Sequence, residues 1–365
     1  MRVVFAPDKF AGTLTAVEAA AAMARGWARR APDDELVQVP MSDGGPGFVD
    51  VLHTALGGDL LAATVSGPYG EPTPAAVLVV DRTAYVESAQ AVGLHLTPEE
   101  DRAPEQATTR GLGELLRKAL DTDVDRIVVG LGGSATNDGG AGLLAALGAT
   151  ARGGDLDAGP AALADLTSVD LDRVGEQFVG VDLVMGTDVD NPLLGINGAT
   201  KVYGPQKGLP DERLVVVDGW LQHFAELTDR KLAAHKGAGA AGGLGFALML
   251  LGGRRTPGVG LVSDAVGLAD HLAKADLVVT GEGAFDFSSR SGKVPSGVAA
   301  VAAEALRPCI ALAGRVLIGA REMRATGIES AYAVVDLVGE EASFADPAGS
   351  LTALAERVAR TWGRD

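Results

Sequence analysis

A glycine-rich loop between two apolar patterns is the stretch of this sequence best suited to chemistry. A β-branched run at residues 127–129 predicts a strand, and the apolar pattern at residues 141–147 predicts a helix. Glycine lets a backbone lie against a ligand without a Cβ in the way, and a helix N-terminus attracts anions. A tight turn with a Ser or Asn cap is the simpler alternative. We call residues 130–140 the glycine loop, and its candidate ligand groups are Gly132, Gly133, Ser134, Thr136 and Asn137.

Four further loops, each after a predicted strand, carry acidic side chains. Carboxylate oxygens suit Mg²⁺, and a carboxylate can accept the proton of a hydroxyl group. One such loop by itself is most often an Asx turn or a helix cap. Four loops of the same kind favour a shared site. Their polar groups are Asp8 with Lys9, Ser42 with Asp43, Asp188 with Asp190, and Glu282 with Asp286.

Lysines beside glycine-containing loops are the candidate phosphate partners, because an ammonium group is a compact point charge. The lysines in such positions are Lys9, Lys207, Lys236 and Lys293. No reactive cysteine and no Ser–His pair accompanies these groups in the sequence. The inventory therefore favours phosphoryl transfer, in which positioning and charge neutralisation do most of the catalysis, over covalent catalysis.

Two known nucleotide-binding motifs help to decide which class of nucleotide site the chain contains. A Walker A motif is absent, because Phe287 stands where the motif needs its first glycine. Residues 237–242 match GxGxxG, but the preceding residues 228–236 are polar and helix-like, whereas a dinucleotide site needs a strand there. A nicotinamide-dependent oxidoreductase of a small hydroxy acid, with Asp264 near the required spacing, is therefore the weaker alternative. A non-catalytic metabolite sensor is a third.

Charge and cysteine content exclude several classes of protein. The chain has 365 residues and a formal charge of −17, whereas nucleic acids and anionic membranes both require a basic surface. No apolar run is long enough for a membrane span, and the N-terminus predicts a strand rather than a signal peptide. The single cysteine, Cys309, rules out a disulfide framework. We expect a cytoplasmic protein with a buried thiol and no zinc site, because the histidines are scattered.

The order of predicted elements indicates an α/β protein with mostly parallel sheets. A capping box formed by Thr15 and Glu18 predicts the start of the first helix. Helices are expected at residues 16–30, 48–56, 108–120, 141–147, 212–225, 242–251, 295–306 and 351–362. Strands are expected at residues 3–5, 36–39, 60–65, 76–80, 84–87, 127–129, 179–185, 276–280, 310–313 and 331–335. Because ligands of open α/β sheets bind at the carboxyl ends of strands, the candidate groups are expected at those edges.

Six segments, in this order, resemble the class I (bacterial-type) glycerate kinase family over nearly the whole chain. They are APDKFAGTLTAVEAA, PMSDGGPGF, VGLGGSATNDGGAGLLAALGA, GTDVDNPLLGINGATKVYGPQKG, GAGAAGGLGFAL and DLVVTGEGAFDFSSRSGKVPSGVA. The resemblance implies ATP- and Mg²⁺-dependent phosphorylation of glycerate, giving 2-phosphoglycerate in most members and less often 3-phosphoglycerate. The sequence departs from the family pattern at Pro46, at Phe48 and at residues 288–291, where an arginine is displaced by one position. A kinase of another small hydroxy acid is therefore a further alternative.

The resemblance also implies the domain organisation. A flavodoxin-like domain, residues 76–269, is expected as an insertion into a discontinuous α/β domain made of residues 1–75 and 270–365. The family places its active site in the cleft of two such domains. Small-molecule substrates, and a monomer or homodimer, are expected.

The combined hypothesis gives each loop a role. The glycine loop and the helix after it cradle ATP phosphates, assisted by Lys207, Lys293, Glu282 and Asp286, with Mg²⁺ at Asp188 or Asp190. The acceptor is held by Asp8, Lys9, Ser42 and Asp43, and Lys9 or Arg290 pairs with the glycerate carboxylate. The base that accepts the hydroxyl proton stays open among Asp8, Asp43, Asp188 and Asp190, with Asp188 preferred.

Overall fold

The computed structural model describes residues 1–10, 12–287 and 292–363. These residues form two compact units. The terminal unit consists of residues 1–43, 50–57 and 259–365, so that it contains both chain ends. The inserted unit consists of residues 44–49 and 58–258. Each unit is described by itself below.

A fully parallel five-stranded sheet forms the centre of the terminal unit, in the order β13-β12-β11-β1-β2. The strands are β1 (Arg2–Pro7), β2 (Glu35–Gln38), β11 (Leu277–Phe285), β12 (Cys309–Val316) and β13 (Ser330–Ala333). Their apolar residues are nearly continuous because helices cover the sheet. The buried thiol of Cys309 confirms the prediction for this residue, and burial raises its pKa to about 12.

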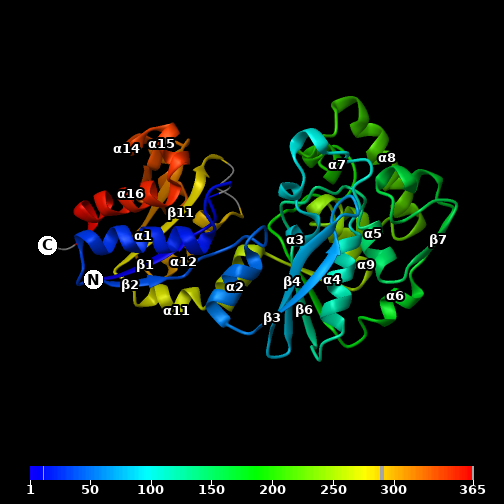
Figure 1. Ribbon diagram of the computed structural model, residues 1–365, viewed down its shortest axis with the longest axis horizontal. Helices are drawn as coiled ribbons and strands as arrows, with labels where there is room; N and C mark the ends of the chain where they lie inside the picture. Colours follow the sequence, from blue (N-terminus) through cyan, green and yellow to red (C-terminus); the bar gives the residue numbers. More distant parts are fainter. Residues whose placement is uncertain (11, 288–291, 364–365) are drawn as a thin grey trace. The chain divides into compact units, whose positions relative to one another are not determined.

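Helices lie on both faces of this sheet, with α1 and α16 on one face and α11 and α12 on the other (Figure 1). The predicted capping box is confirmed: Glu18 N donates to Thr15 Oγ1 over 3.1 Å, and Thr15 N donates to Glu18 Oε2 over 2.9 Å. The helices are α1 (Ala16–Arg30), α2 (Phe48–Leu56), α10 (Gly258–Ala265), α11 (Leu268–Ala273), α12 (Val294–Glu304), α13 (Ala320–Ala325), α14 (Val334–Val338), α15 (Glu340–Ala345) and α16 (Pro347–Trp362).

The inserted unit contains a six-stranded mixed sheet in the order β10-β9-β6-β5-β4-β3. β5, β6, β9 and β10 are parallel, whereas β3, β4 and β5 form an antiparallel meander. The strands are β3 (Asp59–Ser66), β4 (Pro72–Val80), β5 (Thr83–Glu87), β6 (Arg126–Gly130), β9 (Asp182–Gly186) and β10 (Arg254–Thr256). β7 (Thr150–Arg152) and β8 (Ser168–Asp170) form a separate pair. β3 and the start of β4 precede the predicted domain boundary at residue 75, yet both belong to this sheet.

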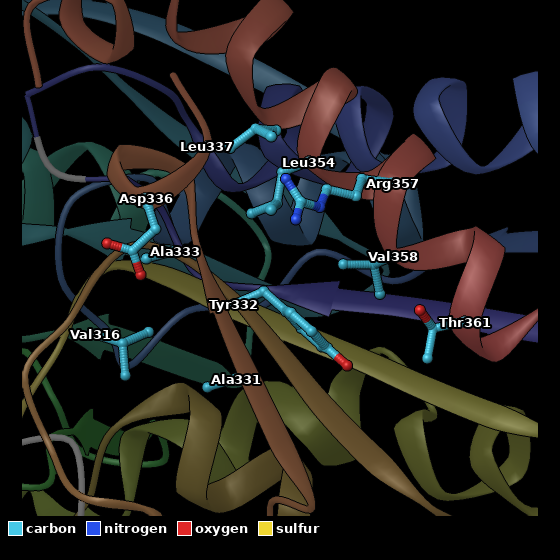
Figure 2. Close-up of a pocket in the computed structure, with 10 residues that line it drawn as sticks. All are labelled: Val316, Ala331, Tyr332, Ala333, Asp336, Leu337, Leu354, Arg357, Val358 and Thr361. Carbon is cyan, nitrogen blue, oxygen red and sulfur yellow. The ribbon is translucent and has the colours of Figure 1, made fainter. Parts of the chain in front are cut away.

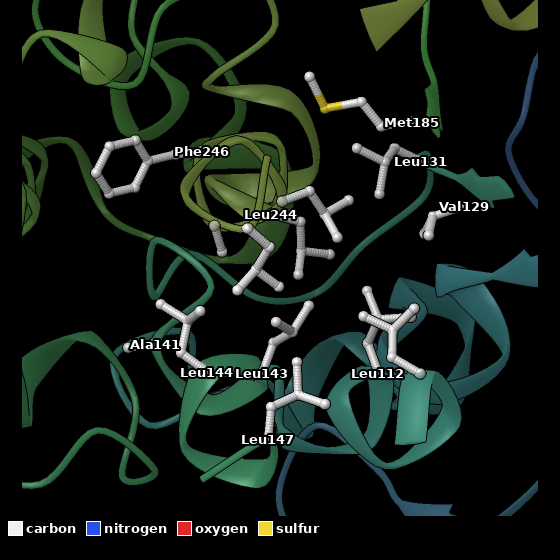
Figure 3. Packing of buried hydrophobic residues seen from close by; sticks show 14 of the residues in the cluster. Leu112, Val129, Leu131, Ala141, Leu143, Leu144, Leu147, Met185, Leu244 and Phe246 are labelled. Atoms are coloured by element: carbon white, nitrogen blue, oxygen red, sulfur yellow. The ribbon is translucent and has the colours of Figure 1, made fainter. Parts of the chain in front are cut away.

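The core of the inserted unit joins this sheet to three of its helices. Figure 3 shows part of this buried cluster, which includes Leu112 of α4, Leu143 of α5, Val129 of β6 and Phe246 of α9. The helices are α3 (Ser88–Val92), α4 (Arg110–Leu120), α5 (Ala141–Ala146), α6 (Asp172–Glu176), α7 (Ala199–Tyr203), α8 (Leu214–Leu227) and α9 (Leu244–Leu250). Short 3-10 helices are η1 (Leu94–Leu96), η2 (Glu99–Asp101), η3 (Pro160–Asp165), η4 (Pro205–Lys207), η5 (Asp211–Arg213), η6 (Leu232–Ala234) and η7 (Ala240–Gly242).

The predicted α/β class, with mostly parallel sheets and a segment inserted between two parts of a discontinuous unit, is confirmed. Several element ends differ from the prediction. β11 was expected to end at Thr280 but continues to Phe285, because its parallel pairing with β12 extends to the pair formed by Phe285 and Val316. β9 begins at Asp182 rather than Val179, and β13 ends at Ala333 rather than Val335, because α14 begins at Val334. In the described part of the chain, no helix combines the length and the apolar character needed to cross a membrane.

Gly26 lets α1 approach α16 closely, which yields a stability prediction. A Cβ at Gly26 would lie 2.1 Å from Thr352 O, and the Thr352 hydroxyl already donates to Ala22 O over 3.1 Å. We expect Gly26→Ala to lower the free energy of unfolding by about 1–3 kcal/mol through overpacking. Urea denaturation measures this change.

Gly219 in α8 provides the matched control, because a Cβ there would meet no heavy atom within 4 Å apart from the neighbouring backbone of its own helix. Gly219→Ala is expected to raise the free energy of unfolding by up to about 1 kcal/mol, the usual preference of a helix interior for Ala over Gly. Equal stabilisation by both substitutions would contradict the close packing of α1 against α16.

Candidate active site

The carboxyl ends of β1, β2 and β11 bring predicted residues of the terminal unit together. Asp8 N donates to Gly281 O over 2.8 Å, so Asp8 lies beside Glu282 of β11. Met41 N donates to Pro7 O over 2.9 Å, and this bond places Ser42 at the same edge. The side chains of Asp8, Ser42 and Glu282 are all buried. Parallel pairing therefore assembles groups that are far apart in the sequence.

Lys9 joins two carboxylates in what we call the Lys9 cluster, made of Asp8, Lys9 and Asp43. Its ammonium Nζ lies 3.5 Å from Asp8 Oδ1 and 3.6 Å from Asp43 Oδ1. Burial raises the pKa of Asp8 to about 6, although Lys9 opposes the shift. Burial also lowers the pKa of Lys9, but the charges of Asp8 and Asp43 outweigh that effect, and the pKa is raised. Lys9 therefore stays charged at neutral pH, whereas Asp8 can exchange a proton.

The remaining predictions for the terminal unit follow β11. Asp286 comes directly after the strand and is half-buried. Lys293 occupies the N-cap position of α12. Arg290 lies outside the described residues.

In the inserted unit, the glycine loop and the loop that carries Asp188 follow adjacent parallel strands. Leu131 N donates to Gly186 O over 2.9 Å, so the two loops leave the sheet side by side. The Gly44–Val49 segment of the SDGGPGF motif lies on the same strand ends. A Cβ at Gly44 would come within 2.7 Å of Gly186 O, so only glycine permits this approach. The motif is thus shared: Ser42 and Asp43 belong to the terminal unit, and its glycines belong to the inserted unit.

Glu87, at the carboxyl end of β5, is a buried carboxylate that the sequence analysis missed. It accepts hydrogen bonds from Gly47 N and Val49 N, both over 3.1 Å, at the start of α2. Glu87 therefore holds the Gly44–Val49 segment against the sheet. An acidic residue at the last position of a predicted strand was the available signal.

Asp138, inside the glycine loop, occupies the position at which a helix N-terminus would meet an anion. Its carboxylate accepts hydrogen bonds from Gly140 N, Gly142 N and both donors of Thr109. Leu143 N donates to Thr109 Oγ1 over 2.9 Å. Burial raises the pKa of Asp138, and these hydrogen bonds oppose the shift. The first N–H groups of α5 are therefore already paired within the protein.

Lys207 is buried and contacts the glycine loop from the protein interior rather than from a face open to a ligand. Its ammonium nitrogen donates to Ser134 Oγ over 3.0 Å and to Thr136 O over 2.6 Å, and only 3% of the residue is exposed. Burial lowers its pKa to about 7, and the nearby charge of Asp138 opposes this shift. These contacts make Lys207 a support of the loop.

The polar side chains of the loop also point into the protein. Thr136 and Asn137 are buried, and Asn137 Nδ2 donates to Thr200 Oγ1 over 2.9 Å. Gly132 is half-buried and Gly133 is exposed, and among the described residues their N–H groups have no acceptor. The face available to a ligand is therefore the backbone of these two glycines.

The predicted metal pair differs in its surroundings. Asp190 is paired with Arg255 over 2.6 Å and with Lys236 over 3.0 Å, and the hydrogen bond from Lys236 lowers its pKa. Two cations at one exposed carboxylate argue against Asp190 as a metal ligand. Within residues 1–10, 12–287 and 292–363, no group of three or more His, Cys, Asp or Glu side chains could hold a metal ion.

The glycines of residues 237–242 serve packing rather than dinucleotide binding. The segment before them ends in η6, not in a strand. A Cβ at Gly242 would lie 1.9 Å from Thr136 O, and Gly139 N donates to Gly242 O over 3.1 Å. Residues 237–242 therefore pack against the glycine loop and support it.

Comparison with known proteins identifies the family of this chain. The sequence profile of the glycerate kinase family matches residues 3–363. The chain belongs to the glycerate kinase family. It is 40% identical to the glycerate kinase of Bacillus subtilis (strain 168), over 92% of this chain and 90% of that protein. It is 39% identical to the glycerate 2-kinase of Escherichia coli (strain K12), over 93% and 92% of the two chains.

Structural similarity supports the same family membership. A crystal structure titled as that of "putative glycerate kinase 2" from Salmonella typhimurium LT2 matches with a TM-score of 0.82 and 37% identity. The match covers 99% of this chain and 98% of that one. The comparisons give no support to the oxidoreductase alternative, which the glycine packing of residues 237–242 also disfavours.

The burial of the Lys207 ammonium group predicts that the stability of the protein depends on pH. Its pKa of about 7 in the folded chain lies below the value of 10.5 expected in the unfolded chain. Between these values the unfolded chain binds the extra proton, so this group makes stability rise with pH in that window. We expect wild type to gain on the order of 2 kcal/mol between about pH 7 and pH 9 relative to Lys207→Met.

Urea unfolding of both proteins at the two pH values measures this difference. Lys118→Met on α4 is the matched control, because Lys118 is exposed and is expected to leave the pH dependence unchanged. Parallel pH profiles of wild type and Lys207→Met would contradict the buried, loop-supporting role of Lys207.

Proposed function

We propose that this chain transfers the γ-phosphoryl group of ATP to the 2-hydroxyl of glycerate, forming 2-phosphoglycerate and ADP. Membership of the glycerate kinase family supports the reaction type, and the name of the Escherichia coli relative supports the position of the hydroxyl. The observation that carries the proposal is the Lys9 cluster, in which a buried carboxyl with a pKa of about 6 lies beside an ammonium group.

In this proposal Asp8 accepts the proton of the attacking hydroxyl. A general base works best when its pKa lies near the working pH, and the raised pKa of Asp8 meets that condition. Lys9 holds the Asp8 carboxylate in place and donates toward the oxygen that loses its proton. Two carboxylates already share this ammonium, so the cluster suits the hydroxyl end of glycerate. Arg290 stays the proposed partner of the glycerate carboxylate.

The phosphates of ATP are assigned to the backbone N–H groups of Gly132 and Gly133. Gly132 is half-buried and Gly133 is exposed, and among the described residues no acceptor takes their N–H groups, which can therefore donate to an anion. Lys293 is proposed to neutralise phosphoryl charge. Lys207 acts from behind the loop, because its ammonium already donates to Ser134 and Thr136.

Magnesium fits this site as a companion of the nucleotide rather than as a resident ion. Mg²⁺ bound with a nucleotide needs only one or two carboxylates besides the phosphates, and it neutralises their charge. Asp188 is the proposed ligand, since Asp190 is paired with two cations. Because the one cysteine is buried and reduced, we also propose the cytoplasm as the place of reaction.

The activity is tested with purified protein, ATP, MgCl₂ and D-glycerate. ADP release that depends on glycerate supports the kinase. Added enolase identifies the product, because it consumes 2-phosphoglycerate directly. If phosphoenolpyruvate forms only after phosphoglycerate mutase is added, the 3-hydroxyl is the acceptor. ADP release at the same rate with and without glycerate would overturn the kinase proposal.

The raised pKa of Asp8 predicts the pH profile. Asp8 must be ionised to accept a proton, so kcat/KM is expected to fall below an apparent pKa of about 6. Asp8→Asn is expected to lower kcat by about 10²–10⁴-fold and to abolish this acid limb.

Asp188→Asn serves as the comparison, because Asp188 is proposed to bind the metal of the nucleotide. It is expected to lower activity while the acid limb near pH 6 persists. An unchanged acid limb in Asp8→Asn would contradict Asp8 as the general base. Loss of the limb in Asp188→Asn alone would identify Asp188 as the base instead.

A further inference from the structure

A cavity of about 450 Å³ lies beside β13, the edge strand of the sheet in the terminal unit. Figure 2 shows its lining residues, which come from the ends of β12 and β13, from α14 and from α16. None of these residues belongs to the candidate active site. The volume falls within the range of roughly 300–1,000 Å³ that is usual for small-molecule sites.

Two opposite charges, both on exposed residues, line this cavity. Among the described residues, neither Asp336 of α14 nor Arg357 of α16 forms an ion pair or a hydrogen bond. The neighbouring Glu356 instead pairs with Arg29 over 3.6 Å and with Arg360 over 3.9 Å. In Figure 2 the Arg357 guanidinium extends from α16 toward the side where α14 carries Asp336. One exposed cation and one exposed anion thus line the same cavity.

The phenol of Tyr332 also lines the cavity. Trp362 Nε1 donates to the Tyr332 hydroxyl oxygen over 2.9 Å, so the phenolic proton is left to donate elsewhere. In Figure 2 this hydroxyl points in the direction of Thr361. Leu354 and Val358 supply a buried apolar wall.

We propose that this cavity binds a small zwitterion with an apolar body, such as an α-amino acid with an aliphatic or aromatic side chain. Arg357 pairs with its carboxylate, Asp336 pairs with its ammonium, and Leu354 and Val358 contact its side chain. The two lining charges sum to zero, so a polyanion such as a nucleotide or a free phosphate gains no net attraction here. A zwitterion instead satisfies both charges at once. The site is separate from the kinase reaction, and its test does not depend on that activity.

Isothermal titration calorimetry with L-phenylalanine tests the proposal on the full chain. 3-Phenylpropionic acid lacks the ammonium and phenethylamine lacks the carboxylate, so each is expected to bind about tenfold more weakly than L-phenylalanine. Inorganic phosphate is expected to show no saturable binding at this site. Arg357→Gln and Asp336→Asn are each expected to weaken L-phenylalanine binding by about tenfold.

Arg360→Gln is the matched control, because Arg360 lies on the same helix but does not line the cavity. It is expected to bind L-phenylalanine as the wild type does, and circular dichroism checks that all variants fold. The proposal is overturned if wild type binds neither L-phenylalanine nor L-leucine. Unchanged affinity in Arg357→Gln, or equal affinity for inorganic phosphate, would also overturn it.

Discussion

Parallel pairing of neighbouring strands is the constraint on which both candidate clusters depend. In the terminal unit, the register of β1 against β11 places Asp8 beside Gly281, and the candidate groups then follow at one edge. In the inserted unit, the register of β6 against β9 places Gly130 opposite Gly186, so their two loops emerge together. Because parallel strands all end at the same edge, one backbone pattern gathers chemistry from distant segments.

Burial of polar groups decides what the glycine loop offers to a ligand. Asp138 takes the N–H groups at the start of α5, and Lys207 takes Ser134 Oγ and Thr136 O. A buried polar group costs free energy unless it is hydrogen-bonded, so these bonds are needed for the loop to fold. They also leave the backbone of Gly132 and Gly133 as the ligand-facing part. The same hydrogen bonds that hold the loop in the protein interior therefore determine which of its backbone groups can bind a ligand.

The two other glycine motifs are explained by the same close packing. Gly242 lies against Thr136 O, and Gly44 lies against Gly186 O, at distances that no side chain would allow. A sequence pattern that resembles a dinucleotide fingerprint is here a structural requirement of the neighbouring loop. The acidic residues also differ in role. Asp190 is paired with two cations, whereas the pKa of Asp8 is raised to about 6.

The sequence by itself determined the α/β class, most helices and the loops that carry the candidate groups, because hydrophobic periodicity and caps are local signals. Thr15 and Glu18 marked the start of α1 without any knowledge of the fold. Only the tertiary structure decided the length of β11, which depends on pairing with β12, and the inward direction of Lys207. Burial, partners and pKa are properties of three-dimensional surroundings, and one sequence does not encode them in any local pattern.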